Sequence, residues 1–73
     1  MRKLYQTVQY PEVGKIYKHY KGGKYKVLTL AKHSETNEDL VIYRSLHFGS
    51  IHARPLNMWF DEISKNVYRF KLV

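Results

Sequence analysis

The alternation of apolar and polar positions along this chain predicts a series of short β-strands. The clearest is residues 25–32 (YKVLTLAK), whose ends alternate while Val27–Leu30 is apolar on both faces, as in a central strand. Residues 40–45 (LVIYRS) are rich in β-branched side chains, and we expect them to pair antiparallel with residues 25–32. Three further strands are predicted over residues 15–20, 51–54 and 67–73.

Turn-forming residues separate these strands. Gly22 and Gly23 lie in the turn at residues 21–24, because glycine supplies the positive φ that tight hairpins need. Residues 33–38 (HSETNE) form a polar loop, and residues 46–48 extend the strand before it turns at Gly49. The final strand, residues 67–73, follows a turn at Lys65-Asn66 and is apolar at every second position; the side chains expected to face inward are Tyr68, Phe70 and Leu72.

The period changes between residues 55 and 63. Apolar side chains recur there at positions i, i+3, i+4 and i+7, which is one face of a helix: Leu56, Trp59, Phe60 and Ile63. Pro55 suits a first helical position, where its missing N–H costs nothing. We expect a short helix or a single 3₁₀ turn that packs on the sheet, with Trp59 in the core and Met58 available at the surface.

These elements predict one mostly β domain over residues 14–73. It follows an arm or edge strand over residues 1–13, whose end is marked by Pro11 and Gly14. Five short strands with tight turns favour a small, strongly bent antiparallel sheet. An SH3-like barrel is its natural closed form, because closure removes exposed edges. The alternative is a small α+β sheet with one packed helix.

Composition narrows the class of protein. The chain has 73 residues and no cysteine, which excludes disulfides and thiolate metal sites. Four scattered histidines lack metal-ligand spacing, so we expect neither a metal nor a cofactor. No apolar run approaches the ~18 residues of a membrane span, and no signal peptide is recognisable. We therefore expect a cytoplasmic protein with no membrane partner.

The excess positive charge is concentrated at one end of the sequence. The formal net charge is +7; residues 1–32 hold eight Lys or Arg and one acid, whereas residues 33–73 hold five of each sign. Five of the seven tyrosines also lie within residues 1–32. Lysines can neutralise phosphates while tyrosine rings stack on bases, so this interleaving favours a partner that bears phosphates. The ordinary alternative is a solvated lysine face with tyrosines that pack across strands.

We therefore expect a non-catalytic binding module that contacts RNA, DNA or a nucleotide through this basic, tyrosine-rich region. The expected contact residues are Lys18, His19, Tyr20, Lys21, Lys24 and Arg54. A protein-interaction domain that uses an open sheet edge or the surroundings of Met58 is the second hypothesis. An enzyme is not expected, because the chain has no elbow-type serine and no glycine-rich phosphate loop.

A small-ligand pocket is the third hypothesis. Arg54 would grip a phosphate in bidentate fashion, Tyr17 would stack on a ring, and Glu35 would accept a hydrogen bond beside His33. The alternative is that Glu35 pairs locally with Lys32 while His33 shapes its loop. Either a nucleotide-like ligand or no ligand at all is compatible with this pattern.

Several short motifs together resemble those of a small bacterial family known as domain of unknown function 1653. The resemblance runs from about Gly14 to Phe70, and it rests on GxxYxHYKG from Gly14, AKHSET from Ala31, VxY from Val41, RPLxM from Arg54, and Arg69-Phe70. It implies a compact cytosolic domain that occurs alone or joined to other domains. It implies no activity, substrate or catalytic residue.

Overall fold

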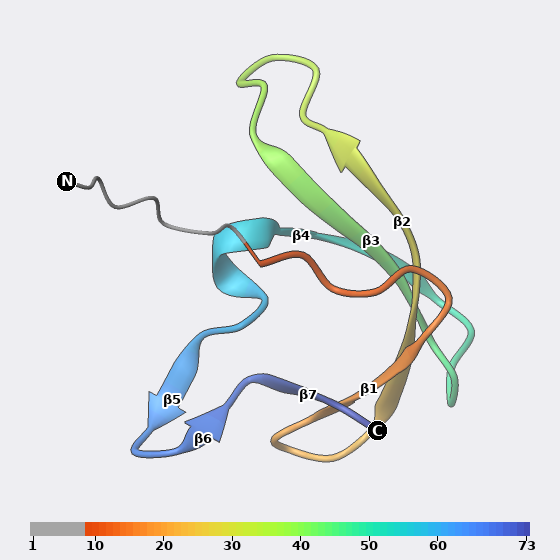
Figure 1. The fold of residues 1–73 in the computed structure, drawn as a ribbon. Helices are drawn as coiled ribbons and strands as arrows, with labels where there is room; N and C mark the ends of the chain where they lie inside the picture. The colour runs from red at the N-terminus through yellow and green to blue at the C-terminus, as the bar shows by residue number, and fades with distance from the viewer. Residues whose placement is uncertain (1–8) are drawn as a thin grey trace, which may run out of the picture.

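The computed structural model describes residues 9–73 of the chain (Figure 1). Residues 1–8 of the predicted arm lie outside this part. The described segment just before the sheet is fixed to it, since Gly14 N–H donates to the Val27 carbonyl at 2.8 Å and Glu12 N–H donates to the Tyr17 hydroxyl at 2.9 Å.

Five antiparallel strands form the main sheet, in the order β4-β3-β2-β1-β7. They are β1 (Ile16–His19), β2 (Lys24–Lys32), β3 (Asp39–Ser45), β4 (Ile51–Pro55) and β7 (Phe70–Leu72). The predicted strands at residues 15–20, 25–32, 40–45 and 51–54 are confirmed, as is the antiparallel pairing of β2 with β3. Residues 46–48 form a turn instead of extending β3.

The sheet is bent but open. β4 and β7 are its two edges, and neither pairs with a further strand within residues 9–73. The expected mostly β class is confirmed, whereas closure into an SH3-like barrel is wrong. The alternative α+β class is also wrong, because the helical part is one three-residue turn. The sheet does not close into a barrel because residues 62–68 form a separate hairpin. Only three residues then remain in β7, which pairs with β1 alone.

That separate hairpin pairs β5 (Glu62–Ser64) with β6 (Val67–Tyr68). The predicted strand over residues 67–73 is therefore split at Arg69, whose N–H donates to the Asp61 carbonyl at 2.7 Å while its own carbonyl accepts from Tyr20 N–H at 2.9 Å. This residue bridges the two sheets. Phe70 faces the core as expected, but Tyr68 belongs to the outlying hairpin and is 48% exposed.

A short 3₁₀ turn, η1 (Leu56–Met58), connects β4 to β5. The helical spacing predicted the burial of Trp59 correctly, whereas Leu56, Phe60 and Ile63 are only partly buried. It overestimated the length of the helix, because one turn is enough to bring Trp59 onto the sheet. Beyond it, residues 62–64 pair as a strand. Figure 1 shows η1 and the β5–β6 hairpin on the same side of the main sheet.

The core lies between that side of the sheet and Trp59, which is fully buried. Its indole stacks on the Phe70 ring, with centroids 3.9 Å apart and planes 4° from parallel. The rings of Tyr43 and Tyr17 meet the indole edge-on at 5.0 Å and 5.5 Å. Aromatic rings thus supply most of the small core, which Val27 and Val41 complete.

Candidate functional site

The two faces of the main sheet differ sharply in chemistry. Residues directly opposite one another in neighbouring strands share a face, and successive residues alternate between faces. Buried Tyr17, Tyr43 and Phe70 mark one side, which we call the core face. The residues between them project from the opposite side, which we call the basic face; its charged members are Lys18, Lys24, Lys26, Arg44 and Lys71.

Three lysines form a row across the basic face. Lys18 in β1 lies directly opposite Lys24 in β2 and directly opposite Lys71 in β7. Neighbouring strands are about 4.8 Å apart, so the row spans roughly 10 Å. Next to it, Lys26 lies opposite Arg44. Like charges placed directly opposite are destabilising, so this arrangement costs stability and must be offset elsewhere.

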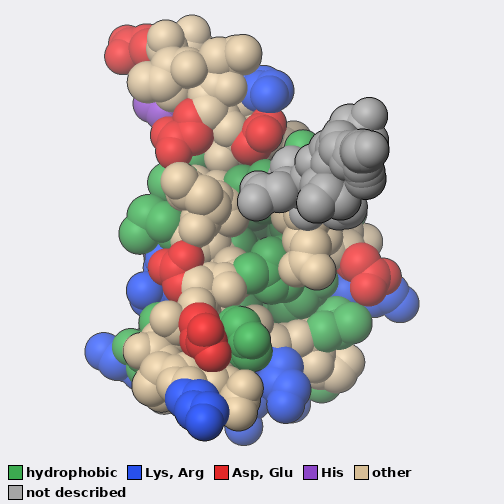
Figure 2. Space-filling model, turned by 60° about the vertical axis from the view of Figure 1, so that its left-hand side comes forward, with side chains coloured by type: hydrophobic (Ala, Val, Ile, Leu, Met, Phe, Trp, Pro, Cys, Tyr) green, Lys and Arg blue, Asp and Glu red, His purple; other side chains and the backbone are tan. Residues whose placement is uncertain are grey.

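Acidic side chains do not neutralise this row. The two ion pairs found among residues 9–73 lie elsewhere: Lys32 contacts Asp39 at 2.7 Å, and Arg69 contacts Asp61 at 3.3 Å. In Figure 2 the Lys and Arg side chains lie mostly around the lower half of the molecule, whereas acidic side chains dominate the upper end, where the β2–β3 loop lies. Acidic side chains also appear in the middle and lower parts of this view, so the excess of positive charge there is local.

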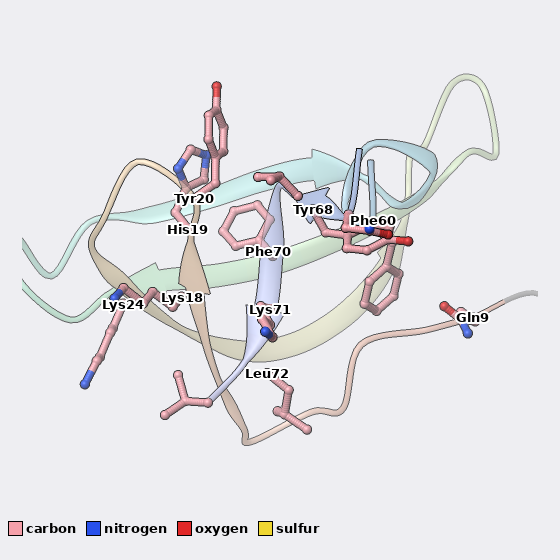
Figure 3. A pocket seen from close by; sticks show the side chains of 13 residues that line it. Gln9, Lys18, His19, Tyr20, Lys24, Phe60, Tyr68, Phe70, Lys71 and Leu72 are labelled. Carbon is pink, nitrogen blue, oxygen red and sulfur yellow. The ribbon is translucent and has the colours of Figure 1, made fainter. Parts of the chain in front are cut away.

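An open hollow follows the free edge of β7 (Figure 3). Lys18 and Lys71 line it from the basic face, and His19 and Phe70 line it from the core face. The hollow therefore extends around the edge of the sheet. Two tyrosines with exposed rings, Tyr20 and Tyr68, line it together with the lysine row. Lys21 Nζ lies 5.8 Å from the centroid of the Tyr20 ring. Stacking surfaces and cations thus share one hollow.

His19 lies on the core face, at the end of the hollow. Its ring meets the Phe70 ring edge-on at 5.0 Å, and its Nδ1 accepts a hydrogen bond from Lys21 N–H at 3.1 Å. Partial burial lowers the pKa of His19, and the nearby charges of Arg54, Arg69 and Lys21 lower it further. The neutral ring with its hydrogen on Nε2 is therefore favoured.

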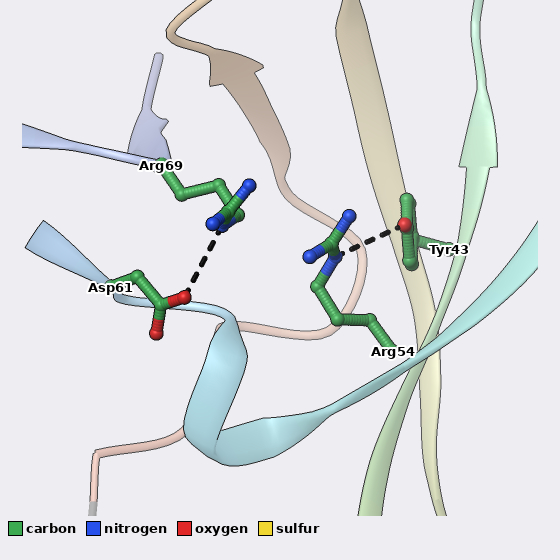
Figure 4. A network of polar contacts seen from close by, with 4 residues as sticks. All are labelled: Tyr43, Arg54, Asp61 and Arg69. Carbon is green, nitrogen blue, oxygen red and sulfur yellow. Dashed lines mark hydrogen bonds and ion pairs between the residues drawn. The ribbon is translucent and has the colours of Figure 1, made fainter. Parts of the chain in front are cut away.

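Two arginines border the same core face. Arg54 Nε donates to the Tyr43 hydroxyl at 3.3 Å, and its Cζ lies 5.5 Å from the Phe70 ring centroid. Arg69 Nε donates to Asp61 Oδ2 at 3.3 Å. Both side chains are partly buried, and Figure 4 shows their guanidinium groups pointing toward one another.

The six expected contact residues do not share one face. Lys18 and Lys24 project from the basic face, whereas His19 and Arg54 lie on the core face. Tyr20 and Lys21 occupy the turn after β1. Four of the six, Lys18, His19, Tyr20 and Lys24, do line the hollow along β7.

Sequence reasoning missed Lys26, Arg44 and Lys71. Lys26 and Lys71 stand at alternate positions in predicted strands, so the alternation placed them opposite the core. The register was the missing information, because only strand pairing shows that Lys71 lies beside Lys18 and Arg44 beside Lys26.

The residues of the alternative pocket occupy different environments. Tyr17 is 3% exposed and its ring packs on Trp59 and Phe60, so it offers little surface for stacking. His33 Nδ1 accepts hydrogen bonds from the backbone N–H groups of Glu35 and Thr36, which shapes the β2–β3 loop. None of these side chains, nor Arg54, lines the hollow along β7.

In the described part of the chain, no helix is long and apolar enough to cross a bilayer. A family model described as protein of unknown function (DUF1653) matches residues 15–72. Neither a curated protein nor a solved structure matches the chain.

Proposed function

The chain belongs to the DUF1653 family, whose description names no activity, and we propose that it is a non-catalytic module that binds single-stranded nucleic acid along the β1–β7 edge. The phosphate backbone lies on the basic face, and bases reach the tyrosines of the hollow. The cross-strand row of Lys18, Lys24 and Lys71 is the observation that carries the proposal.

The lysine row favours binding of a polyanion, because without one the repulsion between the lysines lowers the stability of the sheet. Directly opposed like charges destabilise a sheet, and none of the ion pairs in residues 9–73 relieves this row. A bound phosphate backbone relieves the repulsion and releases counterions at the same time. The strand spacing of about 4.8 Å allows neighbouring lysines to reach successive phosphates with their flexible side chains.

The two tyrosines of the hollow favour a single strand over a duplex. Tyr20 is 40% exposed and Tyr68 is 48% exposed, and both line the hollow that adjoins the row. Their rings can stack on bases that a single strand presents but a duplex hides, which is worth about 1–3 kcal/mol per base. Such stacking tolerates any sequence, so we expect weak sequence preference.

The proposal is tested by fluorescence anisotropy with a labelled, mixed-sequence single-stranded RNA. We expect Lys18→Gln combined with Lys71→Gln to weaken binding about tenfold or more and to reduce the slope of log K against log salt by roughly 1.4, which is 0.7 for each lost contact. Lys18→Gln should not unfold the protein, because it removes repulsion within the row.

Lys32→Gln is the matched control. It removes the same charge from β2 but lies away from the row, where it pairs with Asp39. If Lys32→Gln and Lys18→Gln weakened RNA binding equally, binding would depend only on the net charge of the protein. That result would rule out a site on the basic face.

A protein-interaction surface is the second candidate, and the β3–β4 turn supports it. Phe48 at this turn is 80% exposed, and Ile51 and Leu46 beside it are 57% and 46% exposed. An apolar cluster at a loop tip is typical of a contact with another protein. This surface is separable from the basic face, because Phe48→Ser leaves the lysine row intact.

A further inference from the structure

A second group of cations lies on the core face, separate from the basic face. Arg54 projects there from β4 with its guanidinium near the Phe70 ring. Its Nε is engaged by the Tyr43 hydroxyl, and no carboxylate within residues 9–73 forms an ion pair with it. A partly buried guanidinium without a counter-charge is unfavourable, which makes it a receptor for an anion.

Arg69 presents a second guanidinium to the same space. Asp61 contacts it through Nε, and within residues 9–73 no hydrogen bond or ion pair engages the terminal amino groups of Arg69. The two guanidinium groups point toward one another (Figure 4), although they repel. An anion held between them would replace that repulsion with attraction.

His19 adds a neutral donor beside this space. Because its Nδ1 accepts from Lys21 N–H, the hydrogen of the neutral ring is on Nε2. The lowered pKa of His19 is caused in part by Arg54, Arg69 and Lys21, so the positive fields of these three groups meet at this ring. The charged groups of the cluster, Arg54, Arg69 and Lys21 opposed by Asp61, leave a net charge of +2.

We propose that the core face holds a phosphate-type oxyanion between Arg54 and Arg69, with His19 as a third donor. A net charge of +2 matches a phosphate dianion. Donors from β4, from β1 and from the bend between β6 and β7 suit four tetrahedral oxygens better than the two oxygens of a carboxylate. Arg54 thus keeps the phosphate-gripping role expected from the sequence, with Arg69 and His19 as its partners. The site does not depend on nucleic-acid binding at the basic face.

The protein carries its own reporter for this site. Trp59 is the only tryptophan, and it stacks on Phe70, the ring that both Arg54 and His19 adjoin. Arg54 and Arg69 are only partly buried, so solvent reaches both side chains, and the hollow along β7 ends at their neighbours His19 and Phe70. An anion that settles beside Arg54 therefore changes the surroundings of a single fluorophore.

The experiment titrates the full chain with inorganic phosphate at pH 7.5, with ionic strength held constant by sodium chloride. Trp59 fluorescence and the NMR signals of the arginine Nε–H groups and the His19 ring are the readouts. We expect a saturable response, at least tenfold weaker in Arg54→Gln and in Arg69→Gln. Arg54→Lys should also bind more weakly, because it keeps the charge but loses the planar fork.

Lys26→Gln is the control, since it removes one charge from the basic face and should leave phosphate binding unchanged. A parallel titration with adenosine 5′-monophosphate identifies the source of the phosphate: tighter binding than inorganic phosphate indicates a nucleotide, and equal binding indicates free phosphate.

A response that does not saturate, or that acetate reproduces at the same concentration, would overturn the proposal. This comparison uses the unmodified protein, so it holds even if an arginine variant fails to fold. Equal weakening by Arg54→Gln and Lys26→Gln would overturn it as well. Failure here says nothing about RNA binding by the lysine row, because neither Arg54 nor Arg69 lies on the basic face, so the two proposals can fail separately.

Discussion

His19 shows how one side chain is tuned by its neighbours. The ring lies against Phe70 and accepts a hydrogen bond from Lys21 N–H, and three cations surround it. Protonation would break that hydrogen bond and add a fourth positive charge. Partial burial, reinforced by these cations, therefore lowers the pKa of His19 below its usual 6.5.

This lowered pKa predicts a pH dependence of stability. Below about pH 6.5 the unfolded chain binds a proton at residue 19 more readily than the native protein does. The stabilising contribution of neutral His19 is thus complete above pH 6.5 and is lost as the pH falls through the native pKa. Urea unfolding at pH 7.5 and pH 5.5 should show a smaller loss of stability in His19→Gln than in the unmodified protein. Identical losses in both would contradict this account of the ring.

Among the elements, the three-residue turn η1 positions the central side chain of the core. Its single turn is closed by Trp59 N–H, which donates to the Leu56 carbonyl at 3.0 Å. The turn delivers Trp59 into the core and leaves the adjacent Met58 42% exposed. A small domain that buries one indole at its centre depends heavily on that residue.

We expect Trp59→Ala to cost about 3–5 kcal/mol of unfolding free energy, which is a large part of the 5–15 kcal/mol typical of a domain. Met58→Ala, one residue away on the same turn, should cost much less, about 0.5 kcal/mol, because its side chain is partly solvated and lies outside the core. Denaturation followed by circular dichroism compares the two without relying on tryptophan fluorescence. Similar costs for both would mean that η1 matters for its backbone and that the indole is not the centre of the core.

The elements also show what sequence patterns can and cannot predict. The apolar run with alternating ends located β2, the β-branched side chains located β3, and helical spacing identified Trp59 as buried. The same alternation in residues 67–73 hid the break at Arg69, because the hydrogen bonds that join this residue to Asp61 and Tyr20 come from distant segments. The alternation of apolar and polar residues does not show where a segment changes the strand with which it pairs.

At the scale of the whole molecule, an open sheet with two differently charged faces replaces the expected barrel. The uneven charge along the sequence pointed to Lys18 and Lys24, which the fold places opposite one another in the lysine row. It could not separate them from His19 and Arg54, because a strand sends adjacent residues to opposite sides and register decides which distant lysines become neighbours. The sequence therefore predicted a basic region, and the fold divides it into a row of lysines and a pair of arginines.

The measurement that tests the central claim most directly is an amide NMR titration with a mixed-sequence single-stranded RNA at 50 mM and 200 mM salt. We predict shifts along β1, the start of β2 and β7, centred on Lys18, Lys24 and Lys71, with an affinity about 100-fold lower at the higher salt for five phosphate contacts. Shifts confined to the β3–β4 turn around Phe48, or an affinity that salt leaves unchanged, would contradict nucleic-acid binding by the basic face.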